Sequence, residues 1–258
     1  MSGNLLSICV VTHNNEDMIL TLLRSIYENT IGLKFEMFLV DNASKDFTVD
    51  IVKESYPKVK IIRLKKNKGF SYANNQVIDK IDSEYHVIIN PDITFDTNVF
   101  KALSDYLAQN DEVAIVTPKI ISADKSVQYL GKLSPRFVYL LAGRLKNRFR
   151  FFERYYEDYV MKDKTDKSVE PFEVEVCTGC FMVIRTEIFK RLRGFDERFF
   201  MYFEDVDLSR RARSFGKIIF YPNAQVTHIW ARASAKKVRF LLIHILSMIK
   251  YFFKWRKF

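Results

Sequence analysis

Three carboxylates stand within four residues in the segment 204–207, directly after an aromatic run that ends at Phe203. Apolar walls beside a carboxylate raise its proton affinity, which is how a protein makes a general base. A plain structural interpretation also exists, because a helix from Glu204 to near Gly216 would carry acids in its first turn, arginines in its last turn and a glycine C-cap. The helix alone does not account for the aromatic residues that lead into the acids, so both interpretations stay open here.

The sequence Asn90-Pro91-Asp92 follows an apolar run, and its proline would end a strand. A carboxylate at this point is able to bind Mg²⁺, which typically takes one or two carboxylates together with substrate phosphates. The alternative is an ordinary Asn-Pro-Asp turn. His228 is a second candidate ligand, although a lone histidine is more often a hydrogen-bonded core or surface residue.

Strand-like and helix-like segments alternate through the first half of the chain. Strands are expected at 5–12, 35–40, 58–64, 85–89 and 113–117, and helices at 16–28, 47–55, 70–81 and 97–109. Strands separated by helices of this length indicate parallel βαβ units, so the sequence predicts an α/β fold with a mostly parallel central sheet flanked by helices. Ligands of such sheets collect at the carboxyl ends of the strands, where Thr12, Asp41, Asn67 and Asn90 stand.

The second half of the chain is less regular. Helix and mobile loop are expected over 134–167, an interrupted strand over 173–185, a short helix over 187–193, the acidic helix from residue 204, and strands at 217–221 and 225–229. Neither a dinucleotide-binding glycine motif nor a P-loop is present, so any phosphate must be bound by other means.

The chain of 258 residues carries a formal net charge of +10, but this charge is unevenly distributed. From residue 236 to the end there are seven Lys or Arg and no acid, and without them the net charge is +3. Nucleic-acid binding is not expected, because it calls for a basic stripe across the folded domain. Cys9, Cys177 and Cys180 give no disulfide framework and no convincing zinc site, and no signal peptide is visible, which favours a cytoplasmic, reducing environment.

Seven short motifs occur in a fixed order between residues 5 and 230. They are Val10–Asn15, Val40–Asp46, Asn67–Asn75, Ile89–Asp92, Thr178–Phe181, Gly194–Glu197 and Phe203–Leu208. Each motif is weak by itself, but the ordered set is specific. The chain resembles a family-2 inverting glycosyltransferase with the GT-A fold, of the bacterial rhamnosyltransferase-like branch. The resemblance implies a Rossmann-like GT-A domain over 1–232, followed by a basic amphipathic helical extension over 233–258.

The resemblance also implies a site for a nucleotide-sugar donor. Its donor-binding residues would be Thr12, Asn14, Asp41, Asn42, Asn67, Gly69, Phe70, Asn74 and Asn90. The missing side chain of Gly69 is expected to let the backbone approach the nucleotide closely. Asp92 and His228 would hold Mg²⁺ or Mn²⁺ on the diphosphate. Asn90 stands where many relatives have a carboxylate, which implies a weaker metal site.

By the same resemblance, Asp205 is the catalytic base that deprotonates an acceptor hydroxyl for a single inverting displacement. The acceptor would be contacted by Glu204, Thr178, Gly179 and Cys180. Helical geometry agrees with separate roles, because Glu204 and Asp207 share a face while Asp205 is rotated from its neighbour by about 100°. Asp207 is expected to pair with Arg210 or Arg211 and to be structural.

The tail from Phe240 to Phe253 is strongly apolar, but its 14 residues are too few to span a bilayer. As a helix it would carry one polar stripe, made of Lys237, His244, Ser247, Lys250, Lys254 and Lys257. An apolar helix with basic ends and a tryptophan near its boundary suits the interface of an anionic membrane. Docking on the protein's own core, or on a second subunit of a homodimer, is the alternative.

The resemblance therefore predicts an enzyme at the cytoplasmic face of the membrane that moves L-rhamnose from dTDP-L-rhamnose to a lipid-linked saccharide, for a bacterial surface polysaccharide. A UDP-hexose or UDP-N-acetylhexosamine donor is one alternative. A non-catalytic, nucleotide-sugar-binding partner of another glycosyltransferase is a second. The joint presence of Asp92, Asp205 and His228 argues against a site that only binds.

Overall fold

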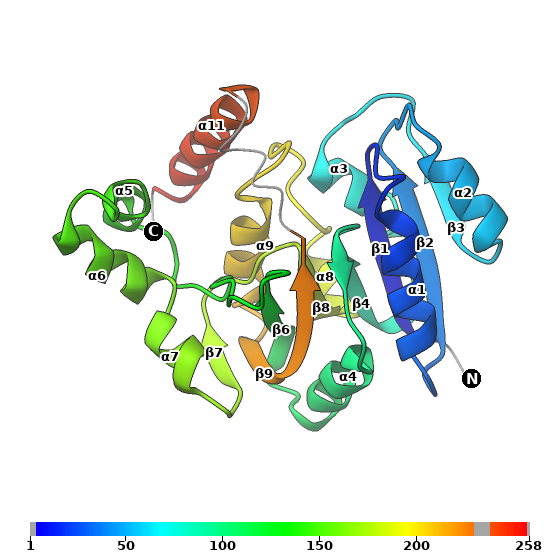
Figure 1. Ribbon diagram of the computed structural model, residues 1–258, viewed down its shortest axis with the longest axis horizontal. Coiled ribbons are helices and arrows are strands. Elements are labelled where there is room, and N and C mark those ends of the chain that lie inside the picture. The colour runs from blue at the N-terminus through cyan, green and yellow to red at the C-terminus, as the bar shows by residue number, and fades with distance from the viewer. Residues whose placement is uncertain (1–3, 230–237, 257–258) are drawn as a thin grey trace.

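Nine strands form one sheet in the computed structural model, which describes residues 4–229 and 238–256 (Figure 1). The strands are β1 (Asn4–Thr12), β2 (Phe35–Asp41), β3 (Lys60–Arg63), β4 (Ser83–Ile89), β5 (Ile93–Thr94), β6 (Val113–Ile121), β7 (Phe172–Val174), β8 (Phe181–Arg185) and β9 (Lys217–His228). Their order is β3-β2-β1-β4-β8-β6-β9-β5, and β7 pairs with β9.

The first half of the sheet is parallel, as the alternating sequence pattern predicts. β1 lies between β2 and β4 and runs parallel to both, and β3 runs parallel to β2. β8 is antiparallel to its neighbours β4 and β6, while β9 runs parallel to β6. The expected α/β fold with a mostly parallel central sheet is confirmed.

Helices cover both faces of the sheet. On one face lie α1 (Ile19–Asn29), α2 (Thr48–Ser55) and α4 (Val99–Gln109). On the other lie α3 (Phe70–Asn75), α8 (Thr186–Arg191) and α9 (Glu204–Ala212). Ile8 of β1 is buried in the first cluster and its neighbour Cys9 in the second. Burial on both faces explains why β1 is a continuous apolar run in the sequence.

Three helices occupy the segment for which the sequence predicted helix and mobile loop. They are α5 (Phe137–Leu145), α6 (Arg150–Tyr159) and α7 (Lys162–Lys167). Tyr139 stacks on Tyr159 with ring centroids 5.2 Å apart, and the ammonium of Lys146 lies 3.4 Å from the ring centroid of Tyr156. These aromatic and cation–π contacts give the segment its order.

Two element ends differ from the sequence prediction. α9 ends at Ala212, so Gly216 is not its C-cap; a Cβ added at Gly216 would instead lie 2.6 Å from the carbonyl oxygen of Glu112. The two strands expected at 217–221 and 225–229 are the single strand β9, whose pairing with β6 shifts register after Pro118. A register shift lets a proline stay inside a paired strand.

The last described helix is α11 (Val238–Trp255), which lies near α9 and α5 (Figure 1). Its Tyr251 is buried, and the guanidinium of Arg210 lies 4.3 Å from the ring centroid of Trp255. Within residues 4–229 and 238–256, no helix is both long and apolar enough to cross a bilayer. The predicted boundary between residues 232 and 233 falls outside the described residues.

Gly69 leads into α3 with a φ of 89°, and a Cβ added there would stand 2.2 Å from the carbonyl oxygen of Phe200. The same carbonyl accepts the N–H of Phe70 at 2.8 Å. The backbone of Phe200 therefore requires a glycine at this position, and the close approach of Gly69 to a nucleotide stays a prediction.

Gly69→Ala is expected to lower the free energy of unfolding by more than Gly32→Ala does. Gly32 has a similar φ of 80°, but nothing lies within 4 Å of its added Cβ. That control carries only the conformational cost of about 1–2 kcal/mol, while the Gly69 variant adds the clash with Phe200. Urea unfolding of both variants measures the difference, and equal losses would show that the contact with Phe200 is not tight.

Candidate active site

The carboxyl ends of the parallel strands bring several predicted donor residues to one edge of the sheet. Thr12 pairs with Asp41 at the ends of β1 and β2, and Asn90 directly follows β4. Thr12 is buried and its hydroxyl donates to Asn15 Oδ1 at 3.0 Å. This placement at the strand ends agrees with the sequence prediction. Donor binding itself stays a prediction for these residues.

Asn14 and Asp41 connect the loops that follow β1 and β2. Asn14, with a φ of 58°, donates its N–H to Ser44 Oγ at 2.9 Å and accepts the N–H of Lys45 at 2.8 Å. Asp41 is buried, accepts the N–H of Ser44 at 2.9 Å and lies 3.5 Å from Arg63 Nε. Both side chains therefore fix the shape of this edge before any ligand binds.

Asn42 orders the next loop of donor candidates. Its Oδ1 accepts the N–H of Lys68 at 2.9 Å. Its Nδ2 donates to Asn67 Oδ1 at 3.1 Å and to the Gly69 carbonyl at 3.2 Å. The loop 67–69 is thus positioned by a single buried amide.

Phe70 and Asn74 lie on α3 in different surroundings. Phe70 packs edge-on against Phe195, with ring centroids 5.5 Å apart, and a Cβ added at Gly179 would come within 3.2 Å of its ring. Phe70 therefore joins the predicted donor loop to the predicted acceptor loop. Asn74 has no exposed surface and donates to the Phe70 carbonyl at 3.0 Å, so in this structure it stabilises α3.

Asp92 and His228 meet because β5 pairs with the end of β9. Asp92 Oδ2 lies 3.3 Å from His228 Nε2, and His228 Nδ1 lies 2.9 Å from Gln128 Oε1. The amide nitrogen of Gln128 donates to Ser122 Oγ and to the His228 carbonyl, so its oxygen accepts from Nδ1. The proton therefore sits on Nδ1, and in the neutral ring Nε2 carries the lone pair that a metal needs.

This pair fits a divalent cation. Asp92 Oδ1 is buried and, among the described residues, has no hydrogen-bond partner. In the same part of the chain, no group of three or more His, Cys, Asp or Glu residues could hold a metal. A cation at Asp92 and His228 would therefore take its remaining ligands from the diphosphate, as Mg²⁺ commonly does.

Asp205 and Glu204 begin α9 and titrate differently. Burial raises the pKa of Asp205, but its carboxylate accepts the N–H groups of Gly179 at 3.1 Å and Val206 at 2.8 Å, which favour the ionised form. Burial, together with the charge of Asp205, raises the pKa of Glu204 well above its usual range, and Glu204 Oε2 finds no hydrogen-bond partner in the described chain. As the pH rises, Asp205 therefore loses its proton before Glu204 does. The ionised carboxylate is the state that a general base needs.

Cys180 shows that the metal candidates and the acid pair belong to one site. Thr178 Oγ1 lies 3.0 Å from Cys180 Sγ. Burial raises the pKa of the Cys180 thiol to about 12, and the charges of Asp92 and Asp205 both add to this rise. The N–H of Asn90 donates to the Cys180 carbonyl at 2.9 Å, and the N–H of Gly179 donates to Asp205 Oδ2 at 3.1 Å. The loop 178–180 therefore joins the segment of the metal candidate Asp92 to the acid pair, although the sequence separates them widely.

Lys132 is a site residue that the sequence analysis missed. A β-bridge to Val176 holds its backbone, and its ammonium lowers the pKa of both Asp205 and Cys180. Gln128 and Lys132 come from the same loop after β6, which no motif marks. The only sequence signal was a basic residue shortly before the Arg-rich segment.

Two residues ahead of the acids adopt strained backbone. Tyr202 and Phe203 have φ values of 69° and 65°, in the left-handed region that bulky L residues rarely occupy. Each such residue costs on the order of 1–3 kcal/mol and persists only where its surroundings fix it, often at a functional site. The aromatic run is visible in the sequence, but this conformation is not.

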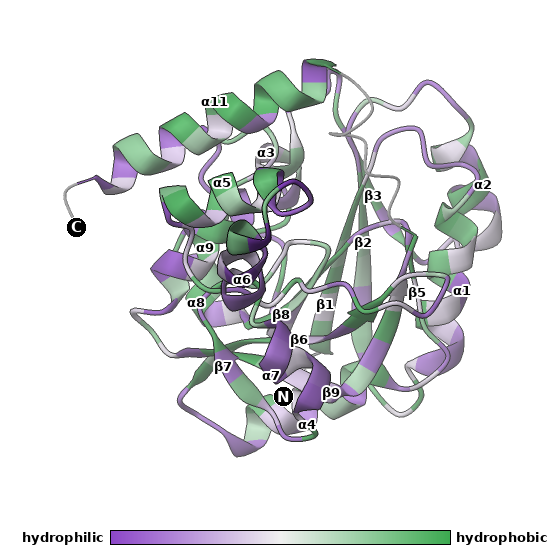
Figure 2. Cartoon of the chain, turned by 60° about the vertical axis from the view of Figure 1, so that its left-hand side comes forward, coloured by the Kyte–Doolittle hydropathy of each residue, from purple (hydrophilic) through white to green (hydrophobic). Residues whose placement is uncertain are grey.

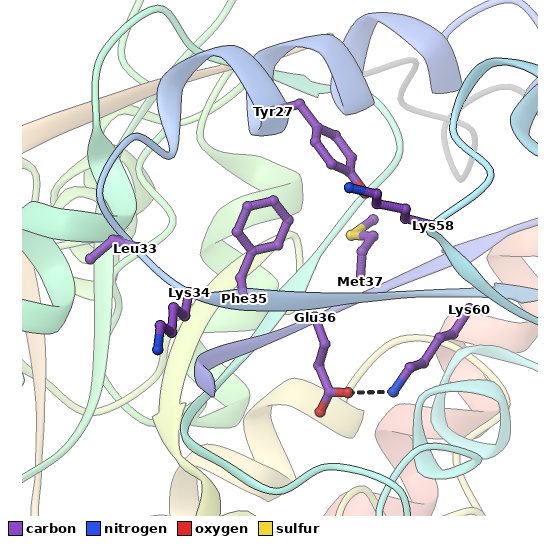
Figure 3. Close-up of a pocket in the computed structure, with 8 residues that line it drawn as sticks. All are labelled: Tyr27, Leu33, Lys34, Phe35, Glu36, Met37, Lys58 and Lys60. Carbon is purple, nitrogen blue, oxygen red and sulfur yellow. Dashed lines mark hydrogen bonds and ion pairs between the residues drawn. The ribbon is translucent and has the colours of Figure 1, made fainter. Parts of the chain in front are cut away.

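A pocket of about 400 Å³ lies elsewhere, at the beginning of β2 (Figure 3). Tyr27, Phe35 and Met37 line it, together with Lys58 and Lys60. β2 starts at Phe35, whereas the candidate site lies beyond the other end of the strand. The pocket is therefore not part of that site.

The sequence profile of glycosyl transferase family 2 matches residues 7–193. The chain is 26% identical over 218 residues to the N-acetylglucosaminyl-diphospho-decaprenol L-rhamnosyltransferase of Mycobacterium tuberculosis, covering 78% of this chain and 68% of that protein. It is 26% identical over 227 residues to the rhamnosyltransferase WbbL of Escherichia coli K12, covering 83% and 79%. The profile ends before the segment 204–207, so the roles of Glu204 and Asp205 stay predictions.

A solved structure of the mannosyltransferase PcManGT from Pyrobaculum calidifontis, in complex with GDP-Man and Mn²⁺, has a TM-score of 0.65 at 19% identity. The likeness covers 97% of this chain and 65% of that one. It shows a shared fold, as the expected GT-A architecture requires. Since the family profile spans most of the chain, the protein belongs to glycosyl transferase family 2 and is a glycosyltransferase.

Proposed function

We propose that this glycosyltransferase moves an L-rhamnosyl group from dTDP-L-rhamnose to a hydroxyl of a lipid-linked saccharide, with inversion at the anomeric carbon. The observation that carries the reaction type is the acid pair, in which the Asp205 carboxylate accepts the N–H groups of Gly179 and Val206, while Glu204 Oε2 has no hydrogen-bond partner among the described residues. The donor and acceptor classes are supported by the two rhamnosyltransferase relatives, one of which carries a lipid diphosphate in its name.

The mechanism follows from the positions of the acids. Asp205 takes the proton of the acceptor hydroxyl while the hydroxyl oxygen attacks the anomeric carbon, and the nucleoside diphosphate leaves from the opposite face with the bonding electron pair. Base assistance of this kind is worth about 10²–10⁴-fold in rate. Glu204, while it retains its proton, is able to donate a hydrogen bond to another acceptor oxygen. Gly179 orients Asp205 through its N–H.

Positive charge for the leaving diphosphate has two sources in this proposal. Asp92 and His228 would hold Mg²⁺ or Mn²⁺, and a cation bound there would stabilise the charge that develops on the diphosphate. Lys132 adds a positive charge that acts on Asp205 and on Cys180. Asn90 supplies no second carboxylate, so the lysine and the diphosphate itself compensate for a sparse metal site.

We also infer that α11 lies in the interface of an anionic membrane. Figure 2 shows α11 as a largely hydrophobic helix on the outside of the molecule. More than half of each side chain is exposed along one apolar stripe, which consists of Val238, Leu242, Leu246, Ile249 and Phe253. The polar stripe expected from the sequence faces inward at its centre, where Ser247 is buried. Exposed Arg239 and Arg256 complement an anionic surface, and the helix contains no acid.

Asp205→Asn is expected to lower the release of nucleoside diphosphate at least about 100-fold, since the base is lost, while donor affinity stays near that of the wild type. The assay uses dTDP-rhamnose, UDP-glucose and UDP-N-acetylglucosamine, each with Mn²⁺ and with chelator. Asp105→Asn on the exposed side of α4 is the matched control. More than a few per cent residual activity in Asp205→Asn contradicts the assignment of the base. A wild type that prefers a UDP-sugar contradicts the proposed donor. Full wild-type activity in chelator contradicts the role of a metal.

The rate of transfer should fall on the acid side with a midpoint above the ordinary aspartate pKa of about 3.9. Burial raises the pKa of Asp205, so the base takes up a proton and activity is lost as the pH falls through that raised value. Lys132→Met should move this limb of the kcat profile to higher pH, because Lys132 favours the ionised carboxylate. Lys53→Met on α2 should leave it in place. If the acid limb of the kcat profile does not move in Lys132→Met, the charge of Lys132 does not act on Asp205.

Leu246→Asp combined with Ile249→Asp is expected to abolish flotation with vesicles that contain phosphatidylglycerol, since binding would then bring two negative charges into the membrane interface. The melting temperature should stay unchanged because both side chains are exposed. Val169→Asp, at an equally exposed apolar position elsewhere, is the control. The membrane proposal is wrong if neither protein floats with the vesicles and the wild type is a dimer that the double variant converts to a monomer. The apolar stripe would then bind a second subunit.

A further inference from the structure

The inner face of α11 covers the strained turn that leads into α9. The ring of Phe203 is buried, and its centroid lies 5.5 Å from those of both Tyr251 and His244. Tyr202 lies 5.1 Å from His244, again between ring centroids. The two residues with left-handed backbone are therefore held from outside by side chains of α11.

Hydrogen bonds from α11 fix the backbone just before this turn. Ser247 Oγ donates to the carbonyl of Met201 at 2.8 Å, and Lys250 Nζ donates to the carbonyl of Arg198 at 2.8 Å. Carbonyls that have accepted such bonds cannot rotate without losing them. The path of the chain from Arg198 to Phe203 thus depends on α11.

A second set of contacts fixes α9 itself. Asp207 has no exposed surface, and its Oδ1 accepts from Trp255 Nε1 at 2.9 Å and from Lys254 Nζ at 2.5 Å. Its Oδ2 accepts from Arg211 Nε at 2.7 Å. Removing one partner of a buried carboxylate leaves an uncompensated charge, so this contact resists displacement. Asp207 lies two residues beyond Asp205 on the same helix.

We propose that α11 is a positioning element of the active site, which holds the Tyr202–Phe203 turn and α9 so that Asp205 stays beside Gly179. The inference rests on the proposed role of Asp205 as the base. It gives α11 a task apart from membrane binding, because the inner face holds the turn while the outer face is exposed. The hydrogen bonds described above end on residues 198–207, next to Asp205, and reach the predicted donor loop only through the contact of Phe200 with Phe70. Loss of these bonds should therefore affect the chemical step more than donor binding.

The test separates positioning from folding and from membrane binding. Tyr251→Ala removes the ring against Phe203, and Ser247→Ala removes a single hydrogen bond. Tyr251→Phe keeps the ring, and Phe215→Ala truncates an aromatic residue beyond the far end of α9. Full-length proteins, free of lipid, are assayed for nucleoside diphosphate release from the preferred donor with water as acceptor. Amide hydrogen exchange over residues 202–206 is measured on the same samples.

Tyr251→Ala is expected to lower kcat about tenfold or more with a smaller change in the donor KM, because misplacing a catalytic group costs rate more than donor affinity. Ser247→Ala should show a smaller loss, and both should exchange the amides at 202–206 faster. Tyr251→Phe and Phe215→Ala should behave as the wild type. Unchanged exchange in the first two variants, or faster exchange with unchanged kcat, overturns the proposal. Wild-type turnover that Asp205→Asn leaves unchanged refutes the proposed function instead, while unchanged amide exchange would still refute the holding of the turn.

Discussion

The carboxylate of Asp207 has no exposed surface, and three side chains compensate its charge. Arg211 reaches it from the same helix and also donates to the carbonyls of Leu192 and Gly194, which ties α9 to the loop after α8. Lys254 and Trp255 reach it from α11. A buried carboxylate is tolerated only when its charge and lone pairs are satisfied, so these three parts of the chain form one unit. The place of Asp205, two residues earlier, depends on that unit.

Three acids within one helical turn thus have three different environments. Asp207 is ion-paired and Asp205 accepts backbone N–H groups, while buried Glu204 has one oxygen without a hydrogen-bond partner among the residues that the structure describes. Of the first two acids, Glu204 holds its proton longer than Asp205 because of its surroundings and not because of its residue type. The helix dipole remains part of the explanation, since it favours negative charge in this first turn, but it does not distinguish the three.

Much of the fold and part of the site could be predicted because they depend on local pattern. Apolar runs between helices gave the parallel sheet, strand ends gave the places of Thr12 and Asp41, and the i, i+4 spacing gave the pair of Asp207 with Arg211. Features set by distant contacts could not be predicted. Lys132 and the partner of Gly69 depend on chain crossings that no local spacing encodes. The periodicity of α11 shows a polar stripe but not that the stripe faces inward.

The carbonyl of Phe200 accepts the N–H of Phe70 and occupies the space that a side chain at Gly69 would need. The loop with Gly69 belongs to the half of the site that is expected to bind the donor. The loop with Phe200 leads to the acids that are expected to contact the acceptor. A ligand that displaces either loop must displace the other as well. Binding of the two substrates is then thermodynamically linked, and reciprocity requires each to change the affinity of the other by the same factor. A single backbone contact between two loops would accordingly transmit this coupling between the two substrates.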